Sequence, residues 1–138
     1  MSFREKSAWA MGLLMLVTGA WYFSIAARLP ADAPAVAQIG PMIPYVLAVV
    51  IGSIVVQIVL AAMSPREAGR EADERERVAL DRAGNWSGYV LAVGAVAGAL
   101  HYVVLGNGNV MFLWVIGALI AAQVAEYGLQ IWFFRRGA

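Results

Sequence analysis

Four long apolar segments restrict the fold more than any other feature of this sequence. They extend over about residues 9–27, 42–63, 86–105 and 110–134, and they contain no Lys, Arg or Asp. As a helix, each is long enough to cross a hydrocarbon core of about 30 Å. Because the apolar residues run continuously instead of alternating, helices are favoured over strands. A helix also satisfies its own backbone hydrogen bonds in lipid. The sequence therefore predicts an all-α integral membrane protein.

The composition agrees with this prediction. Hydrophobic residues make up 62% of the chain and charged residues 14%, whereas soluble domains contain about 25% charged residues. The length suits one domain, so we expect residues 1–138 to form a single four-transmembrane-helix bundle. The basic start and first apolar segment resemble a signal peptide. However, the segment is too long for one and contains Trp21, Tyr22 and Phe23, so we expect a retained helix.

Lys and Arg residues are distributed unevenly between the two sides of the predicted membrane. If the N-terminus is cytoplasmic, nine of the ten lie in cytoplasmic segments and only Arg28 lies outside. Such a bias is typical of cytoplasmic loops in multi-pass membrane proteins. We therefore expect both termini in the cytoplasm and the chain in a bacterial cytoplasmic (inner) membrane.

The first and last connections differ in character. Residues 28–41 contain three prolines, which favour extended chain, so an irregular extracytoplasmic loop is expected there. The segment Gly106–Asn109 is a minimal turn of residues that tolerate positive φ. It should join the third and fourth spans into a tight antiparallel hairpin.

The middle connection, residues 64–83, is highly charged. Ser64 and Glu67 match a capping box with Pro65 at the first helical position, which predicts a cytoplasmic helix or a helical extension of the third span. Gly84 and Asn85 are expected to mark a bend before that span. Acidic and basic side chains here also recur at i,i+4 spacing, as in the pairs Glu71–Arg75 and Asp73–Arg77.

Two interpretations of this charged segment remain open. The simpler one is a solvated helix with internal ion pairs. The other is a docking surface for a cytoplasmic partner, with Asp73, Glu74, Arg75 and Arg77 as the contact residues.

The string Asp73-Glu74-Arg75-Glu76-Arg77-Val78, with Ala83 before the next span, resembles a motif in a family of small four-helix bacterial membrane proteins of unknown function. In that family a D-E-R motif stands just before the third helix. The start of the chain, residues 3–9, also resembles the start of such proteins. The resemblance implies the four-helix layout and carries no catalytic residues.

Small residues indicate how the spans pack. Membrane helices approach closely where side chains are small, and the third span contains Gly94 and Gly98 while the fourth contains Gly117. We expect most such faces to serve packing within the chain. Because four helices leave few fully internal surfaces, a homo-oligomer or a larger membrane-protein partner is also expected.

One polar stripe interrupts the apolar spans. Gln123, Glu126, Tyr127 and Gln130 follow i, i+3, i+4, i+7 spacing and therefore share one helix face. We expect Gln57 of the second span at a similar depth. These five side chains form the candidate proton or ligand site, a small polar cavity open to the cytoplasm.

The role of Glu126 has two readings. A carboxylate near a span's centre costs about 2.5–3.5 kcal/mol on insertion scales and is often functional, as a proton-titrating or cation-binding group. Alternatively, Glu126 is structural and hydrogen-bonds Gln57 or Tyr127, which would hold helices together by about 0.6–2 kcal/mol.

The remaining residues point to little chemistry. The chain lacks cysteine and the common catalytic and nucleotide-binding motifs, so no catalytic residues, metal site, cofactor or nucleic-acid partner is expected. The single histidine, His101, is expected about 14 Å along the membrane normal from Glu126, too far for direct contact.

Three functions follow as hypotheses. The first is a non-enzymatic inner-membrane protein that acts by association, as a scaffold, accessory subunit or regulator. The second is a small oligomeric, proton-coupled transporter or channel that uses Glu126. The third and weaker one is a binder of lipid, quinone or pigment.

Overall fold

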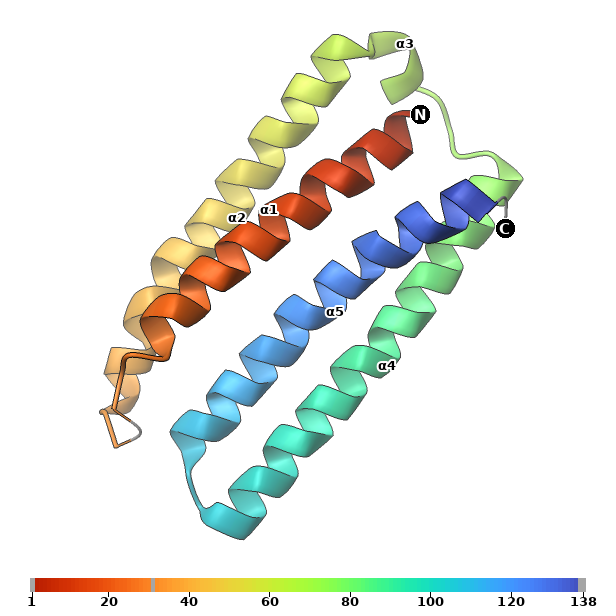
Figure 1. Ribbon diagram of the computed structural model, residues 1–138. Helices are drawn as coiled ribbons and strands as arrows, with labels where there is room; N and C mark the ends of the chain where they lie inside the picture. Colours follow the sequence, from red (N-terminus) through yellow and green to blue (C-terminus); the bar gives the residue numbers. More distant parts are fainter. Residues whose placement is uncertain (1, 31, 137–138) are drawn as a thin grey trace.

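Helices account for nearly all of the chain in the computed structural model, which describes residues 2–30 and 32–136. The described residues form α1 (Phe3–Ala26), α2 (Ala35–Met63), α3 (Pro65–Ala68), α4 (Glu74–Leu105) and α5 (Gly108–Arg136) (Figure 1). The outermost positions of the predicted domain, 1 and 137–138, lie outside the described residues.

Four of the five helices are long and apolar enough to cross a membrane, namely α1, α2, α4 and α5. This confirms the prediction of an all-helical chain with four candidate spans. The N- and C-terminal ends lie at the same end of the molecule (Figure 1). We call it the terminal end, and we call the opposite end, with the connections α1–α2 and α4–α5, the loop end.

The first connection is shorter than predicted. Helix α2 begins at Ala35, so Pro41 and Pro44 lie inside the helix and not in a loop that reaches residue 41. Proline lacks the N–H that would bond the carbonyl four residues earlier. In lipid, the remaining backbone hydrogen bonds of the segment favour a helix despite these two losses. Prolines are accordingly more frequent in membrane helices than in soluble ones.

The middle connection is only partly helical. Helix α3 has four residues, with Pro65 at its first turn as predicted, but the Ser64 side chain makes no capping bond. The predicted capping box at Ser64 is therefore wrong. Residues 69–73 are not helical, and α4 then continues without the bend expected at residues 84–85.

The actual capping box lies at the start of α4. The Glu76 N–H donates to Asp73 Oδ1 at 2.8 Å, and the Asp73 N–H donates to Glu76 Oε2 at 3.2 Å. Because Glu71 precedes the helix, it pairs with Arg77 at 3.4 Å and not with Arg75. Asp73 in turn lies 3.9 Å from Arg70. Both i,i+4 pairs predicted from spacing are thus replaced.

The tight turn between α4 and α5 agrees with the prediction. Gly106 adopts φ +68°, a left-handed conformation that glycine reaches without a steric penalty. Asn107 then caps α5, because its Oδ1 accepts from the Val110 N–H at 3.1 Å.

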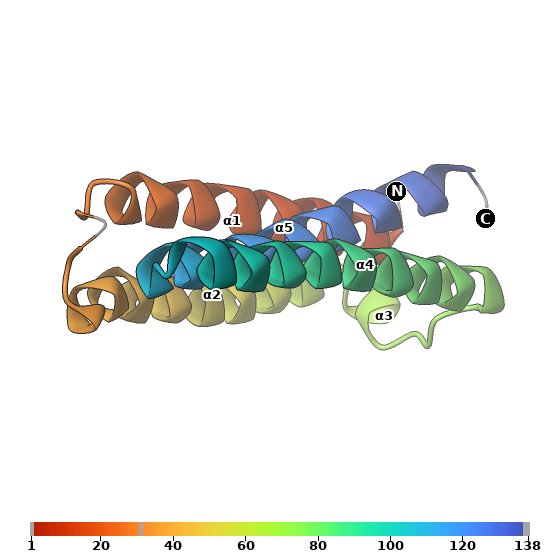
Figure 2. The ribbon, with the colours of Figure 1, turned by 90° about the horizontal axis from the view of Figure 1, so that it is seen from below.

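The long helices pack in the order α2–α1–α5–α4. Helix α1 packs against α2 and α5, and α5 packs against α4, whereas α2 has no extensive contact with α4 or α5. Figure 2 shows α2 and α4 below α1, with α5 running obliquely from the level of α4 at the loop end to that of α1 at the terminal end. The bundle is therefore open along one side, between α2 and α4.

Glycines allow neighbouring long helices to approach each other closely. A Cβ on Gly94 would meet Ala118 Cβ, and one on Gly98 would lie 2.8 Å from Trp114 Cβ, so both glycines let α4 approach α5. Helix α1 approaches α5 in the same way, with Ile120 2.6 Å from a Cβ on Gly19 and Phe23 3.2 Å from one on Gly117. All three glycines named from the sequence thus lie at helix contacts.

The α4·α5 contact provides a test of this packing. In G94A the new Cβ has to displace Ala118, which cannot rotate away, so the free energy of unfolding should fall by about 1–3 kcal/mol. Thermal unfolding in detergent, followed by circular dichroism, should show a lower midpoint for this variant. The matched control is G128A, because Gly128 has no atom within 4 Å of the added Cβ. Equal midpoints for the two variants would contradict the packing described here.

Candidate functional site

The polar stripe of α5 contains one internal hydrogen bond. Gln130 Nε2 donates to Glu126 Oε1 at 3.2 Å. Gln130 is buried and 8% exposed, Glu126 is partly buried and Gln123 is exposed. The stripe therefore runs from a buried amide at the terminal end to an exposed amide near the middle of α5.

Tyr127 belongs to a different contact. A Cβ on Gly12 of α1 would lie 3.2 Å from Tyr127 Cβ, so Tyr127 faces α1. Residues next to each other in a helix lie about 100° apart around its axis. Glu126 therefore points away from this contact, although the two residues are neighbours in sequence.

Gln57 also lies outside the stripe. Its Nε2 donates to Ser7 Oγ of α1 at 2.8 Å. The contacts of Gly52 with Leu14 and of Gly12 with Tyr127 place Gly52 nearly level with Glu126. Gln57 is five residues further along α2, about 7.5 Å nearer the terminal end at 1.5 Å per residue, and so lies near the level of Gln130. Its bond to Ser7 on α1, and not its depth, separates it from the stripe. The structure thus brings together Glu126 and Gln130, but not Gln57.

Helix α5 has two neighbours and two uncovered faces. Ala118 and Trp114 contact α4, while Ile120 and Tyr127 contact α1. One uncovered face carries Leu119, which is 45% exposed, together with Gln123 and part of Glu126. We call these three residues the polar face. No other long helix packs extensively on α5, so this face is open to the surroundings of the protein.

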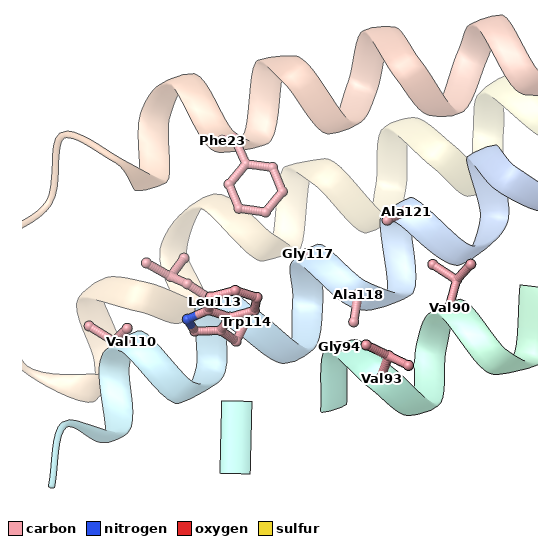
Figure 3. Close-up of a pocket in the computed structure, with 10 residues that line it drawn as sticks. All are labelled: Phe23, Val90, Val93, Gly94, Val110, Leu113, Trp114, Gly117, Ala118 and Ala121. Atoms are coloured by element: carbon pink, nitrogen blue, oxygen red, sulfur yellow. The ribbon is translucent and has the colours of Figure 1, made fainter. Parts of the chain in front are cut away.

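The second uncovered face of α5 forms an apolar groove with α1 and α4, of about 510 Å³. Figure 3 shows Phe23 reaching over it from α1. Small side chains at its base leave room for an apolar chain. The groove is lined by Phe23, Val90, Val93, Gly94, Val110, Leu113, Trp114, Gly117, Ala118 and Ala121.

An ionic cluster joins α1 to α4 at the terminal end. Arg4 Nε lies 3.2 Å from Glu76 Oε2, and Arg4 also donates to the Arg70 carbonyl at 3.3 Å. Arg70 itself lies 3.8 Å from Glu76 Oε2. The Glu76 side chain is only 13% exposed, which weakens screening by water. This cluster links two helices that otherwise have no extensive contact.

A second ion pair joins the ends of α1 and α5. Arg135 Nε lies 3.1 Å from Glu5 Oε1, and its guanidinium lies 5.5 Å from the centre of the Trp9 ring. Sequence reasoning missed both ionic links because their partners are far apart in the chain. The only available signal was that these charges belong to helix ends on the same predicted side.

The four residues named as a cytoplasmic docking surface have different surroundings. Asp73 caps α4 and Arg77 pairs with Glu71. Glu74 and Arg75 are exposed. All four lie at the start of α4, on the terminal end.

Two buried polar groups near the loop end were also missed. Tyr22 is fully buried, with its ring centre 5.2 Å from that of Tyr45 and 5.3 Å from that of Phe23. Tyr22 Oη and Gln38 Oε1 have no hydrogen-bond partner among the described residues. Gln38 falls in the segment predicted to be a loop, whereas it lies in the first turns of α2.

The described residues contain no group of three or more His, Cys, Asp or Glu placed to hold a metal. His101 is partly buried on α4. The contacts of Gly98 with Met111 and Trp114 place it nearly level with Met111. That is fifteen residues from Glu126 along α5, or about 22 Å, further than the sequence suggested.

Comparisons with protein-family models, with curated proteins and with solved structures found no match for this chain. The resemblance of the D-E-R segment to a family of small four-helix membrane proteins therefore stays a prediction.

Proposed function

We propose that this protein is a non-enzymatic, multi-pass protein of a bacterial inner membrane that acts by association, as a scaffold, accessory subunit or regulator. One observation carries the proposal, namely that no other long helix among the described residues packs extensively on the polar face of α5. A surface of this kind favours a function in binding another membrane component.

The energetic argument rests on Glu126 and Gln123. A carboxylate near the middle of a span costs about 2.5–3.5 kcal/mol on insertion scales. Gln130 satisfies one carboxylate oxygen of Glu126, while the exposed amide of Gln123 has no hydrogen bond to another described residue. A protein partner that supplies donors and acceptors at this depth would remove part of that cost.

The orientation we propose has both termini in the cytoplasm. The support is that the terminal end carries every Lys and Arg except Arg28, in line with the usual bias of cytoplasmic segments. In this orientation the ionic cluster and the exposed residues Glu74 and Arg75 face the cytoplasm. They then offer a second contact for a partner at the membrane surface.

Single cysteines test the orientation, because the natural chain has none. In S2C the thiol is at the terminal end, and in D32C it is at the loop end. A membrane-impermeant maleimide should label D32C in intact spheroplasts and S2C only after the membrane is opened. The reverse pattern would place the termini outside and contradict the proposal.

Photo-cross-linking tests the association itself. A benzophenone attached to L119C lies on the polar face, whereas one on V93C lies in the apolar groove, and Val93 is 71% exposed. In native membranes L119C should give discrete protein adducts that mass spectrometry can identify. The V93C control should label mainly lipid. Charge reversal in R75E/R77E should lower the adduct yield several-fold, because the start of α4 is the proposed second contact of the partner. If both cysteines label only lipid, the association proposal fails.

A second candidate function is a small oligomeric, proton-coupled transporter or channel. The observation in its favour is that Glu126 is partly exposed on an uncovered face within a candidate span. Such carboxylates commonly mark proton or ion pathways.

The transporter hypothesis makes a distinct prediction for E126Q. Because glutamine cannot exchange a proton, pH-driven flux in proteoliposomes should fall to the background of empty vesicles. The variant should keep its helical circular dichroism, since it preserves the size and hydrogen bonding of the side chain. Q123E, which adds a carboxylate one turn away, serves as the control for changes in charge. Equal flux in wild type and E126Q would rule out Glu126 as the transport site.

A further inference from the structure

We infer that the occupant of the polar face is a second copy of this chain, with Gln123 of each copy donating to Glu126 of the other. This inference rests on the proposed function of association and names the partner. It concerns one surface, the side of the α4·α5 pair opposite the apolar groove.

The geometry of α4 and α5 defines this surface. Val90 of α4 and Ala121 of α5 both line the apolar groove. A step of two residues turns a helix by about 200°, so Gly88 and Gln123 both lie on the opposite side. The α4·α5 register, in which Gly94 meets Ala118, places Gly88 nearly level with Gln123.

The neighbouring part of α4 leaves room for another helix. A Cβ on Gly84 or on Gly88 would meet no atom within 4 Å. In the same register, Gly84 lies nearer the terminal end than Glu126 does, and Gly88 lies nearer the loop end. Glycines at a membrane-helix surface allow backbones to approach closely. An incoming helix can therefore come near enough to α4 for its polar groups to reach α5.

The hydrogen-bonding capacity of the polar face is self-complementary. Glu126 Oε1 accepts from Gln130, which leaves Oε2 as an acceptor. The Gln123 amide supplies two N–H donors. The same face thus presents one donor group and one acceptor about 4.5 Å apart along α5, at 1.5 Å per residue.

Two-fold symmetry brings the Gln123 donor of each copy to the Glu126 acceptor of the other. In an isologous dimer the same patch of both subunits meets. If the axis lies along the membrane normal, equivalent residues stay at equal depth. Gln123 then faces Glu126 of the partner with an offset of about one helical turn, which two long side chains can span. The two bonds form together, and each joins one N–H of a Gln123 amide to Oε2 of a Glu126.

Cross-linking of single-cysteine variants tests the identity of the partner. A bismaleimide should join L119C to itself in native membranes and give a dimer. The matched control is A121C, an exposed position on the opposite face of the same helix, which should stay monomeric. Equal dimer yield from both positions would overturn the inference, because contact would then not be specific to the polar face.

Energy transfer between fluorescently labelled copies in lipid vesicles tests the hydrogen bonds. At a series of protein-to-lipid ratios, Q123L should self-associate about tenfold more weakly than wild type, equivalent to about 1.4 kcal/mol. A121L, which places the same leucine side chain on the opposite face of α5, should leave the transfer curve in place. Circular dichroism verifies that both variants fold. Unchanged self-association in folded Q123L would overturn the proposed pairing.

The outcomes also separate this inference from the proposed function. If the benzophenone on L119C labels a different protein and no dimer forms, the second copy is excluded while association stands. If L119C gives neither a dimer nor a protein adduct, both proposals fail. A dimer from L119C together with weaker association of Q123L supports the inference.

Discussion

Close contact at glycines holds α5 between α1 and α4, and the rest of the structure depends on this placement. Gly94 and Gly98 bring α4 against α5, while Gly12 and Gly19 bring α1 against its other side. In lipid, helices gain little from burying apolar surface, so packing and hydrogen bonds decide which pairs form. Helix α2 has one glycine contact, Gly52 with Leu14 of α1, and it accordingly packs at the edge.

The sequence predicts the elements of the fold far better than their contacts. The apolar segments locate all four long helices, and the Gly106 turn follows from local chemistry. Two local signals misled the prediction. Proline at position 41 suggested a loop, although lipid favours a continuous helix there. At the middle connection two capping motifs compete, and Asp73 with Glu76 forms the box while Ser64 does not.

The candidate site was predictable only as a pattern on one helix. Helical spacing places Gln123, Glu126 and Gln130 on one face, and in the structure a hydrogen bond joins Glu126 to Gln130. The same spacing includes Tyr127, which packs toward α1 because Gly12 leaves space for it. The partner of Arg4 is 72 positions away in the chain, so no local spacing predicts that ion pair.

The position of α5 explains why the polar face stays uncovered. A helix with one neighbour on each side keeps two free faces, and in α5 these differ in chemistry. The face that carries Trp114 and Ala121 is apolar, so lipid chains cover it without loss. The other face carries Gln123 and Glu126, whose polar groups lipid chains cannot satisfy. The described residues contain no further long helix that could cover this face. The polar groups of Gln123 and Glu126 therefore favour a contact with a partner that can bond to them.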